Sequence, residues 1–177
     1  MSVVCCLMLS GCKTIQSIRS SWKASPDATH TERMKQLENQ VEVLTSRLES
    51  LEYELRFNVA ANQVSLGKYD DAIRAFREIV NLSPGSSYAA DSLYEIAKIY
   101  KYHLKNPAKA VSTYEELLKR YPKSEFGREA AIEIAEGLSM LGKKAEALEQ
   151  YQNFITKFGR DTYAEKAYFE IGDIYQQ

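Results

Sequence analysis

Few side chains in this chain could do chemistry, and their spacing excludes most kinds of it. Cysteine occurs only at positions 5, 6 and 12 and histidine only at positions 30 and 103, so no Cys or His partner lies at ligand spacing. No glycine-rich loop follows a predicted strand, as phosphate binding would require. The carboxylates between Glu129 and Glu136 are expected on a solvated helix face. The sequence therefore predicts a non-catalytic chain with no metal site and no cofactor.

The charge balance excludes another class of partner. The chain has 23 Lys and Arg against 24 Asp and Glu, a net charge of −1. Neither a nucleic-acid footprint nor a polybasic membrane patch is present, because both need clustered basic residues. We therefore expect protein partners and no nucleic acid.

The first 12 residues have the pattern of a targeting segment. A short apolar run, residues 3–9, is followed by Leu9-Ser10-Gly11-Cys12. This tetrapeptide resembles the bacterial lipobox, in which the peptide is cleaved before a lipid-bearing cysteine. The resemblance implies a signal segment over 1–11, lipidation of Cys12, and a periplasmic protein anchored to the outer membrane. The alternative is an ordinary apolar N-terminus with an accidental Gly-Cys pair.

Residues 12–30 follow as a polar, serine-rich stretch without periodicity, and we expect them to form a flexible tether. Loss of Cys5 and Cys6 with the signal would leave the lipid-bearing Cys12 as the last cysteine. That outcome suits a periplasmic chain that is stabilised by a helical core and not by disulfides.

The strongest internal signal is a repeat. Residues 92–100, SLYEIAKIY, return at 167–175 as AYFEIGDIY, and a weaker copy surrounds Ile134-Ala135. The spacing is 37–38 residues. A fixed period in this range predicts a solenoid, since each unit cannot bury its apolar face alone and must stack on its neighbours.

Each unit is predicted to contain two helices. Apolar residues in the first helix follow a 3.6-residue period, as at Leu93, Ile96, Ala97 and Tyr100. Breaks follow at 67–68, 106–107 and 142–143, and Asn106-Pro107 combines a good N-cap with a proline suited to the first helical position. Small residues recur where two helix axes are expected to approach closely, at Ala72, Ala97, Ala110, Ala135 and Ala147.

This pattern resembles the tetratricopeptide repeat, a helix–turn–helix unit. The first unit matches its consensus at Gly67-Lys68-Tyr69, Ala72, Phe76 and Pro84. The resemblance covers residues 59–177 and implies an all-α fold there, an α-solenoid of three helix hairpins and one further helix. The long period is like that of envelope proteins of the family.

A second apolar pattern precedes the repeats and predicts a coiled coil over residues 31–58. Apolar residues alternate in steps of three and four, which places them at positions a and d of a heptad. They are Met34, Leu37, Val41, Leu44, Leu48, Leu51 and Leu55.

Charged residues beside the heptad stripe indicate how many chains form the coiled coil and whether they run parallel. Arg33 and Arg47 lie at position g, and Glu38 and Glu52 lie at the following e, so they would pair between parallel neighbours. Residues 33–38 and 47–52 both resemble the Arg-h-x-x-h-Glu trimerisation motif, where h is apolar. We expect a parallel homotrimer. The alternative is a long helix that folds back on the repeats.

The resemblance to tetratricopeptide proteins also implies where a partner binds. The first helices line a concave groove, and the positions not used for packing face a bound peptide or helix. These positions are Asp91, Tyr94, Lys98, Lys101, Ile132, Glu136, Phe169 and Asp173. Tyr94 and Phe169 occupy matching positions and form either an aromatic ladder for a partner or ordinary packing.

The lipobox-like head, the coil and the repeats together resemble the coordinators of the Tol–Pal system, which have a trimeric coil and a repeat domain. The resemblance implies an adaptor of the envelope machinery associated with cell division. A first alternative is an assembly lipoprotein similar to the repeat-bearing component of the β-barrel insertion machine. A second is a general oligomeric envelope scaffold.

Overall fold

The computed structural model describes residues 28–159 and 162–176. The predicted signal segment, the lipidation of Cys12 and most of the predicted tether lie outside these residues. The described part of the chain is helical and contains no strand, so the all-α prediction is confirmed. No described helix is long and apolar enough to cross a membrane.

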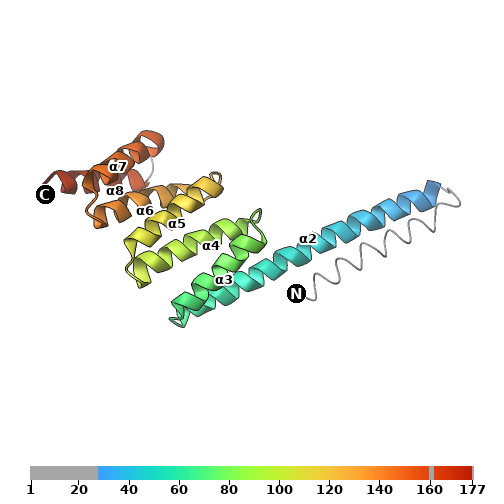
Figure 1. Ribbon diagram of the computed structural model, residues 1–177. Helices are drawn as coiled ribbons and strands as arrows, with labels where there is room; N and C mark the ends of the chain where they lie inside the picture. The colour runs from blue at the N-terminus through green and yellow to red at the C-terminus, as the bar shows by residue number, and fades with distance from the viewer. Residues whose placement is uncertain (1–27, 160–161, 177) are drawn as a thin grey trace. The chain divides into compact units, whose positions relative to one another are not determined.

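The described residues form seven α-helices and one π-helix (Figure 1). Their order is α2 (Ala28–Ser65), α3 (Tyr69–Leu82), α4 (Ser87–Lys98), η1 (Ile99–His103), α5 (Pro107–Arg120), α6 (Gly127–Met140), α7 (Lys144–Phe158) and α8 (Thr162–Gln176). The chain divides into two compact units, one up to Glu49 and one from Ser50.

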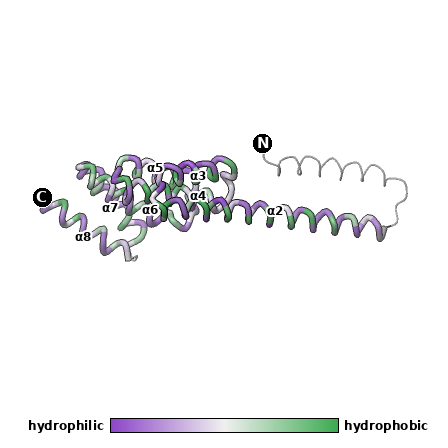
Figure 2. Tube along the Cα trace, turned by 90° about the horizontal axis from the view of Figure 1, so that it is seen from below, coloured by the Kyte–Doolittle hydropathy of each residue, from purple (hydrophilic) through white to green (hydrophobic). Residues whose placement is uncertain are grey.

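The described part of the first unit is helical and carries the predicted heptad stripe from Met34 to Leu48. Leucines of the stripe are exposed in the single chain: Leu37 is 49% exposed, Leu44 63% and Leu48 59%. The same helix continues to Ser65 without a break at residue 58, where the sequence had suggested a boundary between coil and repeats. Apolar and polar residues alternate along α2 (Figure 2). The coiled coil itself stays a prediction.

The second unit consists of successive helix hairpins. The C-terminal part of α2 pairs with α3 through Phe57 and Phe76, whose rings meet edge to face at 5.1 Å. The following helices pack in chain order, α4 with α5 and α6 with α7, and α8 packs on α7 and α6. Each helix thus buries its apolar face against sequence neighbours, as expected for a stacked-repeat fold.

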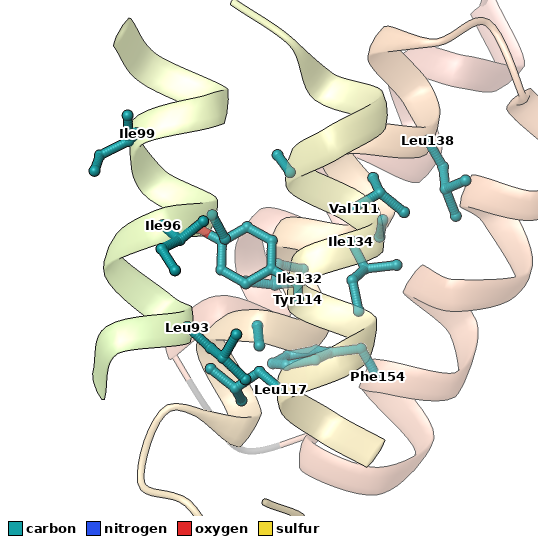
Figure 3. Close-up of a cluster of buried hydrophobic side chains, with 14 of the residues drawn as sticks. Leu93, Ile96, Ile99, Val111, Tyr114, Leu117, Ile132, Ile134, Leu138 and Phe154 are labelled. Carbon is teal, nitrogen blue, oxygen red and sulfur yellow. The ribbon is translucent and has the colours of Figure 1, made fainter. Parts of the chain in front are cut away.

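Small and aromatic residues share the core of this unit. Ala72, Ala97, Ala110, Ala135 and Ala147 are all buried, as their repeated positions predicted. The aromatic residues at one matching position of successive units are also fully buried: Phe76, Tyr114 and Tyr151. Figure 3 shows Leu93 and Ile96 of α4 pointing toward Tyr114 of α5.

The predicted helix boundaries at the second hairpin are confirmed. The side chain of Asn106 accepts a hydrogen bond from the backbone N–H of Lys109 at 3.1 Å, and Pro107 is the first residue of α5. This arrangement satisfies one donor that the first helical turn would leave unpaired.

The π-helix absorbs one extra residue in the second unit. Ala60 and Ala72 are 12 positions apart, and so are Ala135 and Ala147, whereas Ala97 and Ala110 are 13 apart. Between the latter two, the N–H of Leu104 donates to the carbonyl of Ile99, five residues earlier. A π-bulge accommodates a single inserted residue without ending the helix. The packing alanines therefore keep their positions.

The same unit carries a residue in the left-handed backbone region. Gly67 and Gly142 have φ values of 72° and 75° at the turns of the first and third hairpins. The matching turn of the second hairpin has Lys105, with φ 50°. A side chain at positive φ is strained, whereas glycine is not.

We expect Lys105→Gly to stabilise the fold by about 0.5 kcal/mol, because relief of this strain exceeds the added entropy of the unfolded chain. The reverse change, Gly142→Lys, should destabilise by about 1 kcal/mol. Urea unfolding followed by circular dichroism measures both. If Lys105→Gly instead lowers the free energy of unfolding, the contacts of the Lys105 side chain stabilise the fold by more than its left-handed backbone destabilises it.

Candidate functional site

The first helices of successive hairpins, α4 with η1, α6 and α8, share one polar surface, which we call the first-helix face. Its centre is Lys101 in the π-helix, whose side chain is only 6% exposed. The ammonium forms ion pairs with Glu133 and Glu136 of α6. Glu136 also pairs with Lys166 of α8, so the two lysines join three helices.

Tyrosine hydroxyls extend this network along the same face. Tyr94 of α4 donates to one carboxylate oxygen of Glu129 at 2.6 Å, and Tyr163 of α8 donates to the other at 2.7 Å. Tyr102 donates to Glu133 at 3.1 Å. Both carboxylate oxygens of Glu129 are therefore occupied by donors from neighbouring helices, which hold the helices in register.

The side chain of Tyr94 is held between this network and an aromatic contact. Its ring stacks on Phe126 with centroids 4.3 Å apart and an interplanar angle of 14°. The Lys98 ammonium lies 5.3 Å from the same ring and pairs with Glu95 at 2.8 Å. Offset stacking and a cation over the ring both favour this orientation.

Hydrogen bonds and ion pairs keep the carboxylates and the Lys101 ammonium of the network charged. Burial alone would raise the pKa of Glu136, but hydrogen bonds from Lys101 and Lys166 outweigh it and hold that pKa below its usual value. Hydrogen bonds from Tyr94 and Tyr163 lower the pKa of Glu129. Burial would lower the pKa of Lys101, yet hydrogen bonds to Glu133 and Glu136 raise it well above the ordinary value. Lys101 thus remains a cation and cannot act as a nucleophile at neutral pH.

The structure brings only some of the predicted groove residues together. Lys101 contacts Glu136 directly, and Tyr94 lies beside Lys98. Asp91 is half-buried on α4, and its pKa is raised by burial and by the charge of Glu125.

Two predicted groove residues, Ile132 and Phe169, lie outside this network. Phe169, 73% exposed, and Asp173 lie on α8 at its exposed surface. Ile132 is fully buried in the core, so its side chain does not reach a partner from this position. The prediction placed it in the groove because it matches Tyr94 in the repeat, but an aliphatic residue there packs inward.

Sequence reasoning missed several members of the face. Glu129 and Glu133 were expected only on a solvated helix surface, and this was wrong: Glu129 accepts from two tyrosines, and Glu133 is 13% exposed and paired with Lys101. Glu136 was predicted in the groove, and its side chain is 15% exposed and paired with two lysines. The spacing of these three glutamates, four and three residues, places them on one helix face and could have indicated a shared role. Tyr163 and Lys166, which bind Glu129 and Glu136, lie about one repeat further along the chain. Residue spacing alone does not predict a contact at that separation.

Among the described residues, no group of three or more His, Cys, Asp or Glu side chains could hold a metal ion. Every carboxylate in the network accepts from a tyrosine or a lysine. The arrangement is suited to fixing helices and presenting a polar surface.

Successive antiparallel helix pairs with small residues at their contacts define a stacked helical repeat protein. The comparisons identify the repeat: residues 54–86 and 91–124 match the family model of the tetratricopeptide repeat. These two stretches therefore carry tetratricopeptide repeats. The third hairpin packs in the same way, although it lies beyond the matched residues. No catalytic family is matched, and no curated protein matches the chain.

Several solved structures share the fold. A crystal structure of MamA is 20% identical with a TM-score of 0.56, and the alignment covers 70% of this chain but 62% of MamA. The Yersinia enterocolitica type III secretion chaperone SycD, in complex with a peptide of the translocator YopD, is 18% identical with a TM-score of 0.53. That alignment covers 70% of this chain and 88% of SycD. The P58(IPK) TPR domain is 17% identical with a TM-score of 0.50, and the alignment covers 92% of this chain and 41% of the P58(IPK) chain. At these identities the likeness shows the fold alone.

The network predicts a pH-dependent contribution to stability. Glu136→Gln should destabilise the chain by about 2 kcal/mol at pH 7, because it removes a buried charge that two lysines bind. The folded pKa of Glu136 is lowered, so its contribution is present above the unfolded value of 4.5 and is lost as pH falls through the folded pKa. Denaturant unfolding at several pH values measures the difference between variant and wild type.

The difference in free energy of unfolding between wild type and Glu136→Gln should be constant between about pH 6 and 8 and shrink below about pH 4.5. Glu165→Gln, an exposed carboxylate of α8, is the matched control and should have little effect at any pH. A difference that persists undiminished at pH 3 would show that Glu136 acts through packing rather than charge.

Proposed function

We propose that this chain is a non-catalytic scaffold whose first-helix face binds a peptide or helix of a partner protein. The observation that carries the proposal is the continuous surface across α4, α6 and α8, with side chains fixed from one helix to the next. A surface whose side chains are already ordered loses little entropy when a partner binds. SycD, a structural neighbour, is seen with a bound peptide, and this supports the same mode of use.

We also propose that α2 multiplies this site by forming a parallel trimer. The stripe from Met34 to Leu55 supports it, since its leucines are exposed in the single chain. Glu52 pairs with Arg56 of its own helix at 2.7 Å, and in a trimer Arg47 of a neighbouring chain would approach the same carboxylate. Three linked sites raise apparent affinity without new contacts, because the second and third binding events are intramolecular.

The proposal also includes where in the cell the protein lies and which cellular process it serves. A lipid on Cys12 would hold the scaffold at the outer membrane, facing the periplasm, where a Tol–Pal-like role in cell division fits the order of head, coil and repeats. The lipobox-like residues and the long repeat period support this reading. An assembly lipoprotein of the β-barrel insertion machine is the second candidate, favoured by the same head and repeats but not by the heptads.

Photo-crosslinking of the full chain in its own cells tests the binding face. A benzoyl-phenylalanine replaces Phe169 or, separately, Lys98, and a control position is Glu78, exposed on α3. We expect discrete adducts with another protein from positions 169 and 98 and none from position 78. Equal adducts from all three positions, or adducts from position 78 alone, would contradict the proposed face.

A further inference from the structure

Every unit of the solenoid has a small residue at the same position of its first helix. In the first three units this residue is an alanine with no exposed surface: Ala60, Ala97 and Ala135. The second helix of the same hairpin has a buried alanine 12 or 13 residues later: Ala72 in α3, Ala110 in α5 and Ala147 in α7. Small residues at a helix crossing let the two axes approach closely. The alanine of the first helix therefore marks where a second helix covers it.

The first helix of the fourth unit, α8, has Gly172 at this position, 37 residues after Ala135. Gly172 is half-buried, whereas Ala135 has no exposed surface. Apart from its own helix, no atom lies within 4 Å of the place that a Cβ of residue 172 would occupy. Among the described residues, α8 packs on α7 and α6, and no second helix covers this position. The position for close helix contact is thus present in α8, and it is open.

Large aromatic side chains surround Gly172 on the same side of α8. Tyr168 is 60% exposed, Phe169 73% and Tyr175 70%. The side chains at the matching positions of α4 are covered, because Leu93 is fully buried and Tyr94 and Tyr100 are half-buried. We call Tyr168, Phe169, Gly172 and Tyr175 the open α8 face. It presents the side chains that the following helices cover in the second hairpin.

The second hairpin shows what covers these positions when a second helix is present. The ring of Tyr114 in α5 lies 5.9 Å from the ring of Tyr94, at an interplanar angle of 58°. The ammonium of Lys109, directly before Ala110, lies 5.2 Å from the centre of the Tyr100 ring. The covering helix therefore supplies an aromatic ring and a cation in addition to its alanine.

The repeats also define the apolar stripe of a helix that fits this surface. The second helices share an alanine, an aromatic residue four positions later and a large apolar residue three positions beyond that, all buried. These sets are Ala72, Phe76 and Ile79 in α3, Ala110, Tyr114 and Leu117 in α5, and Ala147, Tyr151 and Phe154 in α7. Such spacing places the three side chains on one helix face.

The exposed surfaces of a second copy of the chain do not supply this stripe. The heptad stripe of α2 consists of methionine, valine and leucine, without an alanine or an aromatic residue. In α8 itself, Ala164 precedes Tyr168 by four residues, but Ala164 is only 3% exposed. Another protein is therefore the better source of the covering helix.

We propose that the open α8 face binds an amphipathic helix of a partner protein that carries the second-helix stripe. The alanine of that helix lies over Gly172, its aromatic residue packs beside Phe169, and a lysine directly before the alanine lies over the ring of Tyr175. The inference does not rest on the proposed function, because Tyr168, Gly172 and Tyr175 are outside the network of the first-helix face.

Fluorescence anisotropy with the full chain tests the open α8 face. The probe is a labelled peptide of residues 106–121, the α5 sequence, held helical by a lactam between its exposed Glu115 and Lys119 side chains. We expect saturable binding. Gly172→Ala, which introduces the residue of the other three units, should keep the affinity, whereas Gly172→Leu should weaken it about tenfold because it holds the helices apart. Neither side chain meets a neighbouring helix in the chain, so both variants should fold.

A matched peptide separates close contact from general apolar attraction. The probe with Ala110→Leu is more apolar but should also bind about tenfold more weakly. Absence of saturable binding to wild type, or equal binding by Gly172→Leu or by the Ala110→Leu peptide, would overturn the proposal. If Leu44→Asp/Leu48→Asp self-associates and Gly172→Leu abolishes this, the occupant is a second copy and the proposal also fails. Adducts from position 98 should be unchanged in Gly172→Leu, which distinguishes this surface from the first-helix face.

Discussion

Close contact between helices at small residues is the constraint on which the repeats depend. Ala72, Ala97 and Ala135 have no exposed surface, and Ala110 is 2% exposed. An alanine at each crossing lets two helix axes approach, and aromatic residues such as Tyr114 then fill the space beside them. A larger side chain at any of these positions would separate a hairpin from its neighbour, and because each unit is stabilised by stacking, the loss would reach the adjoining units.

The inserted residue in the second unit shows how strictly this contact is maintained. The π-helix Ile99–His103 takes up the extra position, so Ala97 and Ala110 still meet their neighbours. The turn that follows has the same left-handed backbone as the turns of the other hairpins, with Lys105 in place of Gly67 and Gly142. Lys101 lies within this π-helix and pairs with Glu133 and Glu136 of α6, so the polar centre of the first-helix face is located at the inserted residue.

The sequence predicted the features that repeat and missed those that depend on one unit alone. The period located the hairpins, and the Asn106-Pro107 pair located a helix start, because both follow from local chemistry. Burial of Ile132 and pairing of Glu136 depend on which helix lies opposite, which periodicity does not report.

The core residues of the repeats are buried within the single chain, whereas the leucines of the α2 stripe are exposed, and we propose that other copies of the chain cover them. Light scattering of residues 28–177 tests this claim beside Leu44→Asp/Leu48→Asp and the control Asn39→Asp/Ser46→Asp, which adds the same charge away from the stripe. We expect the mass of three chains for wild type and control, and a folded single chain for the stripe variant. A single-chain mass for wild type would contradict the proposed trimer.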